Sequence, residues 1–204
     1  MVQLTRGLGL LESAVSYALA SAGLATPQHL TLATPCTGWD LRMLLDHVSD
    51  SLDVLSEAVC TGSVGLGPSP GDDGPGPDPV TGLRRRATRL LATCAAAGPP
   101  ERLVAIADRE LTTSLVAMTG AIEIAVHGWD IAAACGVRRP VPADLAAALL
   151  PIAPLLITPS TRPGLFADPV PVSGLAAPGD KLAAFLGRQP SLQAPPLPPE
   201  SRTA

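Results

Sequence analysis

The sequence predicts an all-α fold, and two features of its composition support this prediction. Alanine and leucine, both strong helix formers, dominate the chain, whereas aromatic residues make up only 2% of it and runs of β-branched residues are scarce. Several long segments also lack glycine and proline. With 204 residues, the chain is long enough to bury a core without disulfides. We therefore expect one helical domain over residues 1–190 and a disordered tail, rich in proline and serine, over residues 191–204.

Helical periodicity places two long helices in the first third of the chain. The first is predicted over residues 8–24, where apolar side chains recur with the spacing of one helical face. The second follows the segment T-P-C-T-G (34–38), with Thr37 as its N-cap and Asp40 three residues later in a variant of the capping box. Its expected core stripe consists of Leu41, Leu44, Leu45, Val48, Leu52 and Leu55.

The remaining helices are predicted after residue 79. Two long ones are expected over residues 80–97 and 113–135, the second ended by Gly136 as a C-terminal cap. Residues 142–156 predict a shorter helix that prolines interrupt, and residues 180–186 predict one more. Because short connections flank the long amphipathic helices, the expected architecture is an antiparallel four-helix bundle with a short extra C-terminal helical segment.

One connection differs from the others in composition. Residues 61–79 are dominated by glycine and proline, which cannot sustain a helix, and the segment is longer than an ordinary connection. We expect it to be a mobile loop, in a place where it could cover a site between the helices.

Charge and cysteine usage exclude several classes of protein. The formal net charge is −4, and the only dense basic run has no aromatic residues between its members for base stacking, so we expect no nucleic-acid partner. That run consists of Arg84, Arg85, Arg86 and Arg89. The sequence has neither an uninterrupted apolar membrane span nor a signal peptide, so we expect a cytoplasmic protein that does not bind membranes. No C-x-x-C pair occurs among the four cysteines, which predicts core residues or free thiols at Cys36, Cys60, Cys94 and Cys135.

Polar groups inside a long apolar segment provide the strongest functional signal. In the sequence A-I-E-I-A-V-H-G-W-D (121–130), Glu123 and His127 lie four residues apart and therefore on one face of the predicted helix. Burying a carboxylate or an imidazole is costly unless it has a partner, and a divalent metal ion would satisfy both. His47, at the border of the apolar stripe of the second helix, is a candidate third ligand, and Asp130 could orient His127 as an outer carboxylate.

Ordinary structural roles remain open for each of these residues. Glu123 and His127 are also a suitable internal ion pair, and His47 could be a border histidine with a hydrogen bond to a neighbour. An aspartate in the position of Asp130 commonly binds backbone amides or an arginine. Two histidines and one glutamate are nevertheless the ligand set of an open catalytic zinc site.

Three segments in the same order resemble one protein family. They are T-P-C-T-G-W-D-L-R-M-L-L-D-H-V (34–48), E-I-A-V-H-G-W-D-I-A-A-A-C-G (123–136) and D-K-L-A-A-F-L-G-R-Q-P (180–190). They are similar to the metal-binding branch of the DinB-like superfamily that is related to mycothiol-dependent maleylpyruvate isomerase. The resemblance implies a DinB-like four-helix bundle that holds a divalent metal through His47, Glu123 and His127. The maleylpyruvate isomerase has a substantial separate C-terminal domain, whereas the part of this chain after Gly136 is short.

The resemblance also implies a reaction class. Zinc is the favoured metal, with nickel, iron or manganese as alternatives, and mycothiol is the implied cosubstrate. The leading hypothesis is a thiol transferase or isomerase that acts on a small electrophilic molecule. Two alternatives are a metal-dependent hydrolase or biosynthetic cyclase that uses no thiol, and a non-catalytic metal-binding or stress protein. A homodimer is a further expectation.

Overall fold

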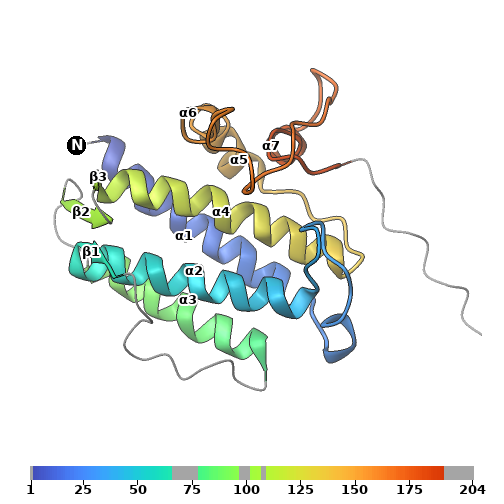
Figure 1. The fold of residues 1–204 in the computed structure, drawn as a ribbon, viewed down its shortest axis with the longest axis horizontal. Coiled ribbons are helices and arrows are strands. Elements are labelled where there is room, and N and C mark those ends of the chain that lie inside the picture. The colour runs from blue at the N-terminus through green and yellow to red at the C-terminus, as the bar shows by residue number, and fades with distance from the viewer. Residues whose placement is uncertain (1, 66–77, 97–101, 107–108, 191–204) are drawn as a thin grey trace, which may run out of the picture.

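Four long helices form the body of the protein in the computed structural model, which describes residues 2–65, 78–96, 102–106 and 109–190. These helices are α1 (Val2–Ala22), α2 (Leu41–Thr61), α3 (Pro79–Ala96) and α4 (Thr113–Ala134). Figure 1 shows α1 lying along α4, and α2 lying along α3 on one side of that pair. The mostly helical architecture confirms the predicted fold class, a DinB-like bundle with additional C-terminal helices.

Shorter elements extend the bundle at its C-terminal side. They are α5 (Ala143–Leu149), α6 (Ala153–Leu156) and α7 (Pro178–Phe185), and a 3-10 turn, η1 (Pro27–His29), follows α1. In Figure 1, α5, α6 and α7 lie on the side of α1 and α4 that faces away from α2 and α3. The break between α5 and α6 confirms the predicted helix with proline interruptions, since Pro154 stands in the first turn of α6.

A small sheet at one end of the bundle was not predicted from the sequence. It contains β1 (Ser63–Val64), β2 (Leu103–Ile106) and β3 (Arg109–Thr112) in the order β1-β2-β3. β1 pairs in parallel with β2, and β2 pairs with β3 in an antiparallel hairpin. Strands of two to four residues are too short to show a period-2 pattern, which explains why sequence periodicity missed them.

The start of α2 corrects the predicted capping. The helix begins at Leu41, and Asp40, rather than Thr37, is the N-cap, with its carboxylate accepting a hydrogen bond of 2.9 Å from the backbone N–H of Met43. Gly38 has a left-handed backbone with φ of 82°, so the chain turns there and cannot yet be helical at Thr37. Similarly, α1 begins at Val2, several residues before the predicted start.

Two of the predicted flexible regions fall mainly outside the described residues. Of the glycine- and proline-rich segment 61–79, the structure describes the end of α2, β1 and the start of α3, while residues 66–77 lie outside it. The tail 191–204 also lies outside the described residues. The expected mobility of both segments therefore stays a prediction.

The helix α4 is the centre of the fold. Its described side chains are buried on several sides, and apart from His127 and Asp130 the buried ones are small or apolar. Among the described residues it is the one helix long and apolar enough to cross a membrane, and 72% of its apolar window is buried inside the protein. Such burial is typical of a bundle's central helix. Polar side chains on α4 therefore need partners inside the protein or in a recess of it.

A glycine sets the distance between α4 and α2. A Cβ atom added to Gly120 would lie 2.6 Å from Cδ2 of Leu55, so the two helices approach closely at this point. We expect Gly120→Ala to lower the free energy of unfolding by about 1–3 kcal/mol, because Leu55 must move or the helices must separate. Gly9→Ala is the matched control: no atom lies within 4 Å of its added Cβ, and it should stabilise α1 by about 0.5–1 kcal/mol. Urea unfolding of both variants would test this, and similar effects of the same sign would contradict it.

Candidate metal centre

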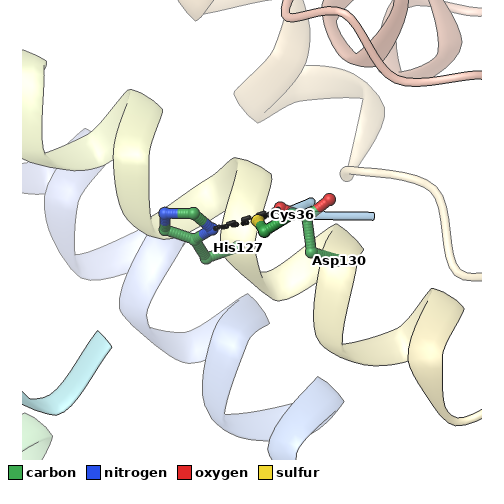
Figure 2. A group of neighbouring side chains, drawn as sticks. All are labelled: Cys36, His127 and Asp130. Carbon is green, nitrogen blue, oxygen red and sulfur yellow. Dashed lines mark hydrogen bonds and ion pairs between the residues drawn. The ribbon is translucent and has the colours of Figure 1, made fainter. Parts of the chain in front are cut away.

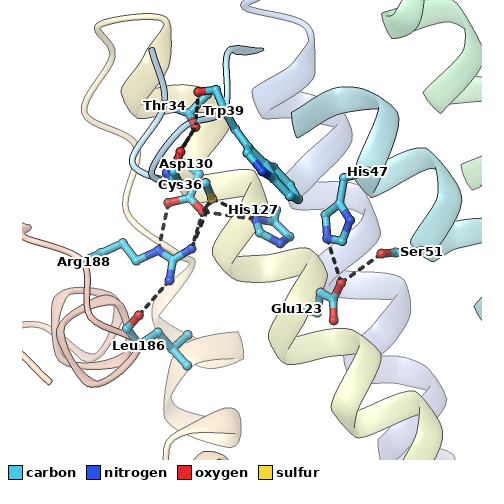
Figure 3. A network of polar contacts seen from close by, with 10 residues as sticks. All are labelled: Thr34, Cys36, Trp39, His47, Ser51, Glu123, His127, Asp130, Leu186 and Arg188. Carbon is cyan, nitrogen blue, oxygen red and sulfur yellow. Dashed lines mark hydrogen bonds and ion pairs between the residues drawn. The ribbon is translucent and has the colours of Figure 1, made fainter. Parts of the chain in front are cut away.

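His47, Glu123 and His127 converge between α2 and α4. Nε2 of His47 lies 3.2 Å from Oε1 of Glu123, and the rings of His47 and His127 are 5.0 Å apart between centroids. One potential ligand atom from each residue lies within 4.8 Å of those of the other two. Figure 3 shows these side chains pointing toward one another from the two helices. The three residues singled out from the sequence thus form one cluster.

The carboxylate of Glu123 is held in its ionised form. Ser51, one turn after His47 on α2, donates a hydrogen bond of 2.9 Å to Oε1 of Glu123. The hydrogen bond from His47 is the main cause that lowers the pKa of Glu123, and it outweighs the opposing effect of burial. An ionised carboxylate close to two imidazoles is a suitable ligand for a cation.

Access to the cluster is uneven. The side chains of His47 and Glu123 are 35% and 38% exposed, whereas His127 as a whole is only 9% exposed. Solvent and small molecules can therefore reach His47 of α2 and Glu123 of α4, while His127 is closed off from them. An open side is what a catalytic metal site needs and what a closed structural site lacks.

The loop before α2 packs against one side of the cluster. The hydroxyl of Thr34 donates to the backbone carbonyl of Trp39 at 3.0 Å and accepts from the backbone N–H of Cys36 at 3.1 Å, which fixes the turn. The turn places the indole of Trp39 edge-on against the ring of His47, with 4.8 Å between centroids. The predicted N-cap segment therefore has a second role, because it restricts the ring orientation of His47.

Behind His127, a buried charge pair connects the cluster to the C-terminal segment. Nδ1 of His127 lies 3.1 Å from Oδ2 of Asp130, and the guanidinium of Arg188 donates to both oxygens of Asp130 at 3.0 and 2.7 Å. Burial disfavours ionisation of Asp130, which is 0% exposed, yet hydrogen bonds from His127 and Arg188 outweigh this and lower its pKa. An ionised Asp130 accepts the proton on Nδ1, which leaves Nε2 of His127 as the ring nitrogen with a free lone pair.

A second group of potential ligands shares His127 and needs to be compared with the first. Sγ of Cys36 lies 3.4 Å from Oδ2 of Asp130 and 4.0 Å from Nδ1 of His127. Figure 2 shows these three side chains next to one another. Burial raises the pKa of the Cys36 thiol to about 12, and Nη2 of Arg188 is 3.6 Å from its sulfur. A protonated thiol and an aspartate already neutralised by arginine are poor partners for a metal cation. The cluster of His47, Glu123 and His127 is therefore the better cation site.

The chemistry of the favoured cluster fits a divalent cation. Two neutral imidazoles and one carboxylate would leave such an ion with about one net positive charge and with coordination positions free toward the exposed side. Nitrogen and oxygen donors of this kind suit zinc, nickel and iron.

Some residues of the site were not identified from the sequence. For Asp130 the sequence left two roles open, an outer carboxylate for His127 and a partner of an arginine, and the structure shows contacts of both kinds, to Nδ1 of His127 and to Arg188. Ser51, Cys36 and Arg188 were not predicted as parts of the site. Arg188 lies 58 residues after Asp130, so no local spacing could connect them. The sequence feature that could have identified Arg188 is its position in the third segment that resembles the family, residues 180–190.

Comparisons with known proteins point to one family. A family model described as the mycothiol maleylpyruvate isomerase N-terminal domain matches residues 11–132, a range that contains His47, Glu123 and His127. Two similar relatives from Mycobacterium tuberculosis are described as uncharacterized proteins, Rv0738 of strain H37Rv and MT0763 of strain CDC 1551 (Oshkosh). Each is 28% identical over 158 residues, covering 76% of this chain and 82% of the relative. No solved structure matches the chain.

Proposed function

Because the chain belongs to the family of the mycothiol maleylpyruvate isomerase N-terminal domain, a metal-dependent and mycothiol-related family, we propose that it is a metal-dependent thiol transferase or isomerase. Mycothiol would be the thiol and a small electrophilic molecule the second substrate. Zinc is the metal we favour, held by His47, Glu123 and His127.

One observation carries this proposal. The potential ligand atoms of the three residues converge within 4.8 Å, and the side chains of His47 and Glu123 are about one-third exposed. A divalent ion held there would supply positive charge that favours the ionised, nucleophilic form of an entering thiol. The exposed side would admit both the thiol and its electrophilic partner.

The protein's own residues would orient the ligands and keep the charge of the site low. Ser51 holds one oxygen of Glu123, and Asp130 holds Nδ1 of His127, so neither ligand needs to reorient when the site is filled. Trp39 restricts the ring of His47 in the same way. With a single carboxylate among the ligands, the site retains the positive charge that lowers the pKa of a thiol.

The state of Cys36 supports the use of a thiol from solution. Cys36 is the cysteine nearest to the cluster, but its sulfur donates to Asp130, and burial raises its pKa to about 12. A thiol that stays protonated at neutral pH is a poor nucleophile. In the proposed reaction, the sulfur of mycothiol forms a bond to the electrophilic carbon, and the displaced electron pair takes up a proton. Departure of the thiol after bond rotation would give isomerisation instead of conjugation.

We expect turnover of an electrophile panel by the zinc-loaded protein to require mycothiol. The rate should follow a thiolate-like pH profile that begins at or below neutral pH, below the ordinary thiol pKa of about 8.5, because the positive charge of the site favours ionisation. Activated alkenes, epoxides and a cis-trans isomerisable diacid would be assayed with mycothiol, with other thiols and without thiol.

The control is the same assay on Glu123→Ala protein, which should give only the uncatalysed rate with its higher pH onset. Equal turnover with and without thiol would contradict thiol transfer and favour the hydrolase or cyclase alternative. Metal binding without turnover of any kind would favour a non-catalytic binding protein.

We further propose that the protein acts in the cytoplasm on small molecules, without nucleic-acid or membrane partners.

A further inference from the structure

A cavity lies at the C-terminal end of α4, on the side of the helix away from the metal ligands. Its volume is about 360 Å³, and its walls include Trp129 and Ala133 of α4 and residues that follow α7. At 100° per residue, Trp129 projects about 200° around the helix from His127. The cavity and the proposed metal centre therefore lie on different sides of α4, with Arg188 of the cavity wall bound to Asp130 behind His127.

Three arginines line this cavity, and two of them are neutralised. Arg138 donates two hydrogen bonds, of 3.0 and 3.2 Å, to the carboxylate of Asp180, which also lines the cavity. Arg188 is paired with the buried Asp130. Of the three arginines that line the cavity, Arg139 is therefore the one whose positive charge is not neutralised by a carboxylate of the described residues.

Arg139 is held in place without a carboxylate partner. Among the residues that the structure describes, no acidic side chain forms a salt bridge with it, and its buried Nε has no hydrogen-bond partner. The guanidinium carbon lies 5.7 Å from the centre of the Tyr17 ring, and the Tyr17 hydroxyl donates to the backbone carbonyl of Arg139 at 2.6 Å. A partly buried cation that is fixed by cation–π and backbone contacts, and that has no carboxylate partner among the described residues, is suited to pair with an anionic oxygen.

The remaining walls add apolar surface. Besides Trp129 and Ala133, the cavity is lined by Val137 and Pro140 beside Arg139. We propose that this cavity binds a small carboxylate with an apolar body, its carboxylate paired with Arg139 and its body packed against Trp129. A cavity of this volume matches a small organic acid in size. The site extends the protein's function beyond the metal centre, and it does not depend on the thiol chemistry proposed above.

Nuclear magnetic resonance of the zinc-loaded full chain can test this directly, since the chain has only two tryptophans. Trp129 lines the cavity, whereas Trp39 packs against His47 at the metal centre, so their indole N–H signals report on the two places separately. The signals would be assigned with Trp39→Phe and Trp129→Phe variants. Hexanoate should shift the Trp129 signal with saturation, and hexanamide, its neutral counterpart, should bind about 10-fold or more weakly.

Arg139→Gln should weaken hexanoate binding about 10- to 100-fold, the effect of losing a charge-assisted hydrogen bond. Arg84→Gln removes the same charge from an exposed position on α3 and should leave the affinity unchanged. A metal-free Glu123→Ala protein should bind hexanoate as before. The proposal is overturned if hexanoate shifts only Trp39, if hexanamide binds equally well, or if Arg139→Gln binds as tightly as the parent protein.

Discussion

Replacement of His47, Glu123 or His127 with alanine should reduce the zinc content of the purified protein from about one ion per chain to near zero. Each replacement removes one of the three protein ligands, and replacement of Glu123 also removes the only carboxylate of the site. Elemental analysis after dialysis against trace zinc would measure the content, and circular dichroism would check the fold. The helical content should persist, because His47 and Glu123 are partly exposed and contribute little to the core.

The chain offers a matched control for this experiment. His29 is the one remaining histidine of the sequence, and it lies in η1, where its Nδ1 accepts only a backbone N–H at 3.3 Å. His29→Ala should keep the full zinc content. If Cys36→Ala abolished zinc binding while Glu123→Ala preserved it, the ion would belong to the alternative group of Cys36, His127 and Asp130, and the assignment of ligands would be wrong.

The sequence predicted those parts of the site that depend on the spacing of residues within one helix. Glu123 and His127 are one helical turn apart, so their common face follows from the periodicity of α4 alone. Their meeting with His47 depends on the packing of α2 against α4, which the two apolar stripes and the family resemblance indicated.

Other features depend on contacts between segments far apart in the chain. The charge pair between Asp130 and Arg188 requires the segment after α7 to return to α4, and no pattern in either segment specifies that return. The N-cap of α2 was misplaced because Thr37 and Asp40 are both good caps, and only the left-handed Gly38 decides between them. The short strands escaped detection because they obtain their order from pairing with one another rather than from their own residues.

The charge pair itself should have the largest effect on stability. In Arg188→Met, the carboxylate of Asp130 remains fully buried and loses both hydrogen bonds from the guanidinium. Removing one partner of a buried ion pair costs about 3–5 kcal/mol in the free energy of unfolding. Urea unfolding of the metal-free protein at pH 7 would measure this. Arg138→Met is the matched control: its salt bridge to Asp180 is exposed, with 57% of the arginine side chain accessible, and should contribute about 0–1 kcal/mol.

The pH dependence distinguishes a charge effect from a loss of packing. In the parent protein the pKa of Asp130 is lowered, so its ionised form contributes stability that is fully present above the ordinary aspartate pKa of about 3.9 and is lost as the pH falls through the folded-state value. Without Arg188, the hydrogen bond from His127 is the main remaining contact that opposes the effect of burial on Asp130. The pKa of Asp130 should therefore rise. The variant then relieves its buried charge by taking up a proton as the pH falls, while the parent protein keeps its ion pair until lower pH. The stability difference between the two proteins should therefore be largest near pH 7 and smaller at pH 5. A stability difference that stays constant between pH 7 and pH 5 would mean that Arg188 stabilises the fold through its packing. The charge of Asp130 would then make no contribution to the effect of the substitution.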